Sequence, residues 1–168
     1  MDAVQDAVLS QFDQLTGLAT REFYQSRIAE AWEQSVLEKN VMALMLVAID
    51  GMDRDSDVDA ALRPKLRDLA AVLSDACKRR SDFAARMRAA EFAVYLAEVD
   101  ADGCMTQGKV ICEEVRKRTA LSVSVGVACF LPRGSHFVRS LYQYADQALQ
   151  DARAAGGNQV RVMTGSDF

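Results

Sequence analysis

Two short segments of the chain carry residues that suit nucleotide chemistry. The first, residues 86–92, reads Arg-Met-Arg-Ala-Ala-Glu-Phe and joins two stretches with the composition of strands. A tight turn of this kind can bring backbone amides to a phosphate where glycine lets the chain adopt positive φ and approach closely. This turn carries Arg88, Ala89 and Ala90 instead, and Glu91 is its only carboxylate. The turn therefore offers basic side chains and a single carboxylate, and it has no glycine.

The second segment is Arg79-Arg80-Ser81-Asp82, which follows a long amphipathic stretch. The guanidinium of Arg79 could pair with a phosphate or with acceptors of a base, and the carboxylate of Asp82 could accept hydrogen bonds from the same ligand. In the other interpretation, Lys78, Arg79 and Arg80 complement a helix C-terminus while Asp82 begins a turn. The residues alone leave both interpretations open.

Length and charge limit the kind of protein that this chain can be. At 168 residues it suits one domain with a single core, and half of its residues are apolar. Its formal charge of −4 argues against a general affinity for nucleic acid or anionic membrane. The longest apolar run, residues 41–49, is about half of the ~20 residues of a spanning helix, and the N-terminus has no signal-peptide pattern. We expect a cytoplasmic domain without membrane contact.

The spacing of the cysteines matches no zinc-binding or redox motif. Cys77, Cys104, Cys112 and Cys129 form no C-x-x-C pair, and His136 is the single histidine. Neither a zinc site nor a redox pair is indicated, so these residues are predicted to be small buried or half-buried side chains.

The hydrophobic pattern predicts helices alternating with strands. Helices are expected over residues 1–12, from the capping Thr20 to about 39, and over 60–78, 105–118 and 137–154. Strands are expected over residues 41–49, 83–87, 92–96, 121–130 and 159–163. One hairpin among helices predicts an α/β (α+β) fold, in which helices cover both faces of a mixed sheet.

Four further motifs, in a fixed order, identify a resemblance. They are Asp-Gln-Leu-Thr-Gly-Leu at 13–18, Leu-Ser-Val-Ser-Val-Gly-Val-Ala at 121–128, Ala-Asp-Gln-Ala-Leu at 145–149, and Ala-Arg-Ala-Ala-Gly-Gly-Asn at 152–158. With the 86–92 turn, they resemble the GGDEF (diguanylate cyclase) family from about Asp13 to Val162. The resemblance implies a nucleotidyl cyclase-like fold with a mainly antiparallel five-stranded sheet. It also divides the chain into a linker helix over residues 1–12 and a domain over residues 13–168.

The same resemblance implies that the catalytic turn is degenerate. The family's two turn glycines fall on Arg88 and Ala89, where a left-handed backbone would cost about 1–2 kcal/mol per residue. Its catalytic acid and metal ligand falls on Ala90, and its other metal ligand falls on Ala48. Without these two carboxylates a magnesium ion has no anchor, and we expect that both magnesium and GTP binding are lost.

Other positions of the family's site are only partly kept. Glu91 and Phe92 remain, and Phe92 is expected to be a core residue of its strand. Asp50 corresponds to the structural member of the family's aspartate pair, while the guanine-binding asparagine falls on Ser56. Arg153 takes the place of a phosphate-contacting lysine and is the one basic residue left there.

These substitutions predict a catalytically inactive GGDEF domain that serves as a regulatory or scaffolding module in bacterial cyclic di-GMP signalling. It would be part of a larger protein, such as one with a neighbouring EAL domain, or would pair with a second copy. One alternative is a cyclic di-GMP receptor, because Arg79-x-x-Asp82 matches the family's inhibitory site. Another is an allosteric GTP-binding domain without turnover, since Glu91 and Arg153 persist. The losses argue against an active cyclase.

Overall fold

The computed structural model describes residues 11–133 and 138–165. The helix expected over residues 1–12 lies outside this part of the chain, except for its last two residues. Of these, Phe12 forms an isolated bridge with Ala19 and is not helical. Within the described ranges, no helix combines the length and the apolar character needed to cross a membrane.

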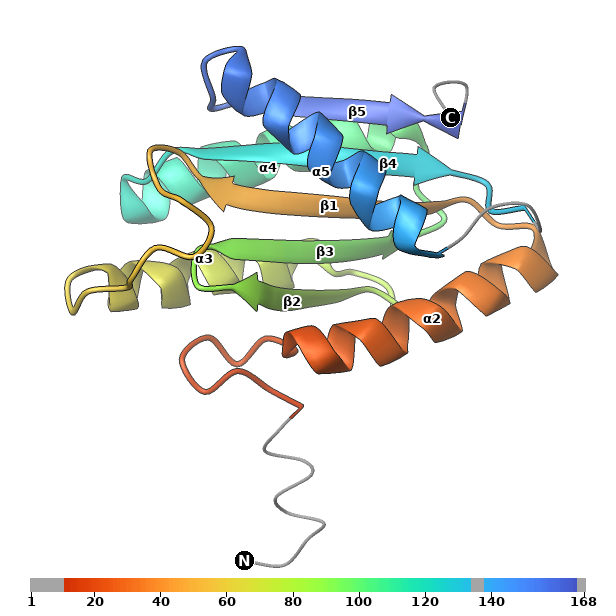
Figure 1. Ribbon diagram of the computed structural model, residues 1–168, viewed down its shortest axis with the longest axis horizontal. Coiled ribbons are helices and arrows are strands. Elements are labelled where there is room, and N and C mark those ends of the chain that lie inside the picture. Colours follow the sequence, from red (N-terminus) through yellow and green to blue (C-terminus); the bar gives the residue numbers. More distant parts are fainter. Residues whose placement is uncertain (1–10, 134–137, 166–168) are drawn as a thin grey trace, which may run out of the picture.

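A single sheet of five strands forms the centre of the molecule (Figure 1). Its strands are β1 (Met42–Ile49), β2 (Phe83–Arg88), β3 (Glu91–Ala97), β4 (Val123–Phe130) and β5 (Val160–Thr164). They lie in the order β2-β3-β1-β4-β5, and β4–β5 is the one parallel pair in this sheet. The predicted mixed, mainly antiparallel five-stranded sheet is therefore confirmed.

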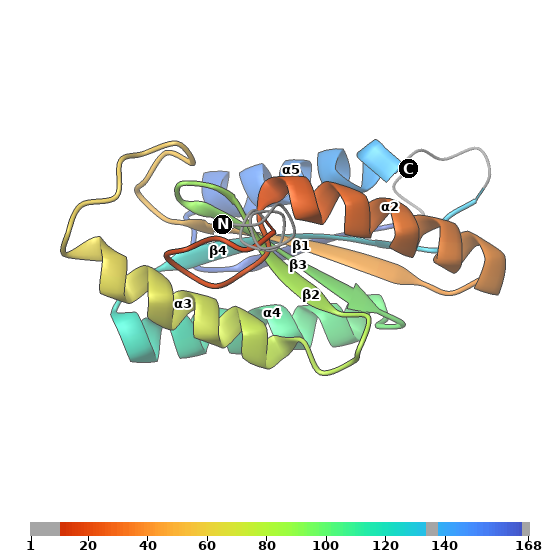
Figure 2. The same cartoon turned by 90° about the horizontal axis from the view of Figure 1, so that it is seen from below.

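Four helices cover the sheet on both faces, as the alternation of elements predicted. They are α2 (Arg21–Glu38), α3 (Leu62–Ala76), α4 (Ala101–Thr119) and α5 (Val138–Ala154). Figure 2 shows α2 and α5 over one face, and α3 and α4 over the other. The central strand β1 is covered from both sides and all eight of its residues are buried, which accounts for its unbroken apolar run.

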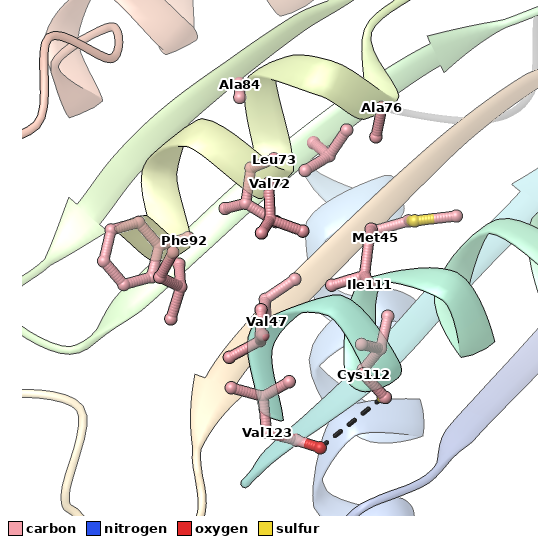
Figure 3. Close-up of a cluster of buried hydrophobic side chains, with 14 of the residues drawn as sticks. Met45, Val47, Val72, Leu73, Ala76, Ala84, Phe92, Ile111, Cys112 and Val123 are labelled. Carbon is pink, nitrogen blue, oxygen red and sulfur yellow. Dashed lines mark hydrogen bonds between the residues drawn. The ribbon is translucent and has the colours of Figure 1, made fainter. Parts of the chain in front are cut away.

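The core beneath α3 and α4 is a continuous apolar layer (Figure 3). Leu73 of α3 and Ile111 of α4 belong to the same buried cluster as Val47 of β1. Phe92 is fully buried in this layer, as the sequence indicated. The cysteines also lie as expected, since Cys104, Cys112 and Cys129 are buried and Cys77 is half-buried.

On the opposite face, α5 packs against the backbone of β4. A Cβ atom added at Gly126 would lie 2.1 Å from the backbone nitrogen of Leu149. Glycine is therefore required here to let the helix approach the strand. This contact fixes α5, which carries three side chains of the site described below.

Some boundaries differ from the prediction, and a capping side chain accounts for the start of α4. Thr20 caps α2 as predicted and accepts a hydrogen bond from the Phe23 amide. However, α4 begins at Ala101 and not near residue 105, because Asp100 caps it by accepting from the Gly103 amide at 2.7 Å. Strands β2 and β3 are also longer than expected, so the turn between them shrinks to Ala89 and Ala90.

Candidate functional site

The strand register brings together the positions that the family resemblance assigns to metal binding. Because β1 and β3 are antiparallel, Ala48 at the end of β1 lies directly opposite Glu91 at the start of β3. Ala90 immediately precedes Glu91. Ala48 and Ala90 are 2% and 1% exposed. Each has a methyl group at a position where the family resemblance places a carboxylate. Glu91 is the only carboxylate among these three positions.

The hairpin turn closes without the backbone strain that the sequence suggested. Neither Arg88 nor Ala89 adopts a positive φ, so the expected cost of a left-handed conformation does not arise. A register shift between Arg86 and Arg88 bends β2 instead. Arg86 then holds the turn, since its Nη2 donates to the Ala89 carbonyl at 2.9 Å and its Nη1 lies 3.3 Å from Asp13. Arg86 is therefore part of the fold and not a free surface charge.

Glu91 is the centre of a buried polar cluster. Its side chain is fully buried, and the Tyr142 hydroxyl donates to its Oε2 at 3.1 Å. Two guanidinium groups flank it, with Arg54 Nη1 at 3.7 Å and Arg88 Nε at 3.8 Å. Burial raises the pKa of Glu91, and the charge of Arg54 opposes that rise. Burial also raises the pKa of Tyr142 to about 12, with Glu91 adding to the effect.

Arg54 connects this cluster to the rest of the site. Its Nη2 donates to Asp146 of α5 at 2.8 Å, while its own carbonyl accepts from the Ala90 amide at 2.9 Å. One residue of the loop after β1 thus joins the hairpin turn to α5. This role of Arg54 could not be predicted from the sequence, because its spacing in the acidic segment 53–57 matches no motif. The only signal was a single basic residue among aspartates.

Asp50 anchors the end of β1 through its own contacts. Its carboxylate accepts from Ser122 Oγ at 2.5 Å, Ser124 Oγ at 2.6 Å and the Asn158 amide at 2.9 Å. A Cβ atom at Gly157, where φ is +74°, would lie 2.9 Å from the Asp50 carboxyl carbon. The carboxylate therefore fits because a glycine stands beside it. These contacts are those of a structural residue.

The remaining basic candidate is also engaged with the protein itself. Arg153 donates from Nη2 to the Met52 carbonyl at 2.6 Å and so ties the end of α5 to the loop after β1. In the same loop, the Ser56 amide donates to the Asp53 carbonyl and closes a turn. Among the described residues, no three His, Cys, Asp or Glu side chains are grouped so that they could hold a metal ion.

The second candidate segment lies at the opposite end of the hairpin, where β2 begins. Asp82 accepts from the Arg79 amide at 3.0 Å and from the Ala97 amide at 2.9 Å, so its carboxylate organises the turn. The Arg79 guanidinium pairs with Glu98 at 2.5 Å, and both side chains are about half exposed. Arg79 and Glu98 also line a cavity of about 530 Å³ that extends to Lys39. The hydrogen bonds of Asp82 agree with the interpretation of residues 79–82 as a turn. The exposure of Arg79 beside a cavity agrees with their interpretation as a ligand site.

A comparison with protein-family models gives the family of this chain. Residues 10–159 match the model described as "Diguanylate cyclase, GGDEF domain". The chain belongs to the GGDEF family. A comparison with curated proteins found no match.

Solved structures of GGDEF domains share the fold of this chain. The GGDEF domain of DgcB from Caulobacter crescentus, in complex with c-di-GMP, is 24% identical with a TM-score of 0.81, over 90% of this chain and 92% of that one. The FimX GGDEF domain from Pseudomonas aeruginosa is 19% identical with a TM-score of 0.75, over 92% and 99%. Vibrio cholerae LapD S helix-GGDEF-EAL, bound to c-di-GMP, is 18% identical with a TM-score of 0.75, over 99% and 39%.

In this GGDEF domain the predicted residues fall into two groups at opposite ends of the sheet. Ala48, Ala90 and Glu91 meet where β1 ends, and Arg153 contacts the loop that follows. Arg79 and Asp82 lie together at the other end. At the first end, Glu91 is buried and paired with Arg54, whereas Arg79 and Glu98 at the second end are about half exposed.

Proposed function

We propose that this GGDEF domain makes no cyclic di-GMP and acts as a regulatory or scaffolding module in cyclic di-GMP signalling. The observation that carries the proposal is the charge arrangement at the hairpin turn. Ala48 and Ala90 provide no ligand for magnesium, and the guanidinium of Arg54 lies beside Glu91. A cation of the protein itself lies next to Glu91, which is the one carboxylate among positions 48, 90 and 91, so these residues do not fit a divalent metal.

The loss of metal ligands bears directly on the reaction. Phosphoryl transfer depends mainly on positioning and on the neutralisation of charge that develops on the phosphate oxygens. A fixed guanidinium held by Asp146 and Glu91 is already satisfied by these two carboxylates. These two carboxylates largely neutralise the charge of Arg54, so Arg54 would stabilise a bound triphosphate only weakly.

A regulatory role requires a partner. The solved structure of Vibrio cholerae LapD contains S helix, GGDEF and EAL segments and is bound to c-di-GMP. By this analogy, we propose that an EAL domain or a second copy of this chain is the partner. A pull-down with a separately expressed EAL domain from the same protein, and sedimentation of the chain alone, distinguish these two partners.

Turnover is the first test of inactivity. The chain is incubated with GTP and magnesium, and cyclic di-GMP is measured by liquid chromatography beside an active diguanylate cyclase as positive control. We expect no product above that of a sample without protein. Protein-dependent formation of cyclic di-GMP, in proportion to the amount of chain added, would contradict the proposal.

A cyclic di-GMP receptor is the second candidate function, and the geometry at Arg79 favours it. The side chain of Arg79 is 48% exposed and lines the cavity of about 530 Å³. A ligand would have to displace Glu98 from Arg79 in order to bind there. Calorimetric titration of the chain with cyclic di-GMP tests this candidate, and the absence of heat at tens of micromolar protein counts against it.

A further inference from the structure

Two cysteines that are far apart in the sequence share one hydrogen-bond acceptor. Cys104 lies in the first turn of α4, and Cys129 lies near the end of β4. Both sulfur atoms donate to the carbonyl oxygen of Val99, at 3.9 Å from Cys104 and 3.3 Å from Cys129. The two side chains are 0% and 5% exposed. This pair could not be predicted from the residue spacing, because it depends on the packing of α4 on the sheet.

The shared acceptor brings the two thiols close to each other, and their surroundings make them chemically unequal. The interaction with Cys104 lowers the pKa of Cys129. The interaction with Cys129, together with burial, raises the pKa of Cys104. Cys129 therefore has the greater thiolate character, and the thiolate is the nucleophile in sulfur chemistry.

We propose that Cys104 and Cys129 form a peroxide-sensitive dithiol, whose oxidation joins the start of α4 to the end of β4 through a disulfide. The Cys129 sulfur attacks a peroxide oxygen, so that an S–O bond forms, the O–O bond breaks and water leaves. The Cys104 sulfur then attacks the oxidised sulfur, and an S–S bond forms as a second water leaves with the thiol proton. The two thiols lose two electrons in total, and hydrogen peroxide accepts them.

The oxidation would act on the loop that borders the Arg79 cavity. A disulfide has an S–S length of about 2.05 Å, which is shorter than any contact between two thiols. Its formation also removes both thiol hydrogen bonds to Val99. Val99 and Asp100 line the same cavity as Arg79, so the first turn of α4 and this cavity wall would shift together. This inference concerns the thiols alone and does not depend on the loss of cyclase activity.

Peptide mapping of the wild-type chain tests the proposal. The folded chain is treated with hydrogen peroxide, unreacted thiols are alkylated in denaturant, and a non-reducing digest is analysed by mass spectrometry. We expect one linked species that joins the peptides of Cys104 and Cys129, is two hydrogen atoms lighter than their sum, and disappears on treatment with dithiothreitol. Digests in which both thiols remain alkylated, or carry only sulfinic or sulfonic acid, would overturn the proposal.

Cys112 provides a matched control on the same helix. Its thiol is also buried, donates to the Val123 carbonyl at 3.6 Å, and has a pKa raised to about 11 by burial (Figure 3). The Cys112→Ser variant should form the linked species as the wild type does. The Cys104→Ser variant should stop at a sulfenic acid on Cys129, which dimedone traps. Equal disulfide formation by Cys112 in the wild type would show unselective oxidation and would also overturn the proposal.

Discussion

The turn of the β2–β3 hairpin and the start of β2 both carry arginine beside a carboxylate, but the two pairs lie in different surroundings. At the turn, Glu91 is fully buried and Arg54 is 19% exposed, so the protein has enclosed this charge pair. At the start of β2, Arg79 and Glu98 are about half exposed. The Arg54–Glu91 pair is therefore a structural element of the fold, whereas the Arg79–Glu98 pair remains accessible to a ligand.

Removal of Arg54 should give the largest effect. The Arg54→Ala variant leaves Glu91 buried without its main cationic neighbour, so the free energy of unfolding should fall by about 3 kcal/mol. Urea denaturation measures this change. The matched variant Arg79→Ala breaks an exposed pair and should cost less than about 1 kcal/mol. If Arg54→Ala and Arg79→Ala lowered the free energy of unfolding equally, the proposed contrast between a structural and an exposed ion pair would be wrong.

A double variant tests whether the effect of Arg54 passes through Glu91. In Glu91→Gln the side chain keeps its size but loses its charge, so Arg54→Ala should cost less in that background. A double-mutant cycle from urea denaturation gives the coupling energy. A coupling near zero would mean that Arg54 stabilises the fold only through Asp146 and the turn.

Asp50 should give the next largest effect. The Asp50→Ala variant removes the acceptor of two serine hydroxyls and of the Asn158 amide, and we expect a loss of about 2 kcal/mol in urea denaturation. Ser122→Ala removes one of these donors and should have a smaller effect. A variant at Asp50 as stable as the wild type would contradict a structural role for this carboxylate.

Cyclic di-GMP binding near the start of β2 should change when a single charged side chain is replaced. If the receptor function holds, Arg79→Ala should weaken cyclic di-GMP binding about tenfold in calorimetry, since a guanidinium contact to a base is lost. Glu98→Gln should strengthen binding several-fold, because it frees Arg79 from its partner. Arg80→Ala removes the same charge one residue further on and serves as the control. Equal effects of the variants at Arg79 and Arg80 would indicate general electrostatic attraction alone.

The pH dependence of stability should give the smallest effect. Burial raises the pKa of Glu91 above its ordinary value of 4.5, so the folded state binds this proton more tightly than the unfolded state does. The contribution of this proton to the free energy of unfolding is fully present below pH 4.5 and is lost as the pH rises through the raised pKa. The free energy of unfolding of the wild type, minus that of Glu91→Gln, should therefore decrease over this interval. An increase would mean that Arg54 lowers the pKa of Glu91 overall.

Much of the fold could be predicted because periodicity and motifs are local properties. The buried run of β1 and the Thr20 cap both identify their elements directly. The start of α4 was placed too late, because Asp100 acts as a cap ahead of the apolar pattern. The helix expected over residues 1–12 stays a prediction, as it lies mostly outside the described residues.

The site was less predictable because its contacts join distant segments. The alanines at 48 and 90 could be found from the sequence, since each occupies a defined motif position. The pairing of Arg54 with Glu91 and Asp146 could not, because it depends on how the loop after β1 crosses the hairpin and meets α5. The shared contact of Cys104 and Cys129 with the Val99 carbonyl could not be predicted for the same reason, whereas the predicted burial of the cysteines is confirmed.

The central claim is that no divalent cation joins a nucleotide to the protein at the hairpin turn. Titration of Mn²⁺ into the chain with a non-hydrolysable GTP analogue, followed by electron paramagnetic resonance, tests it most directly. We predict that the chain does not change the Mn²⁺–nucleotide spectrum. A protein-bound Mn²⁺–nucleotide signal that is lost in a variant at the turn, such as Glu91→Gln, would contradict the account.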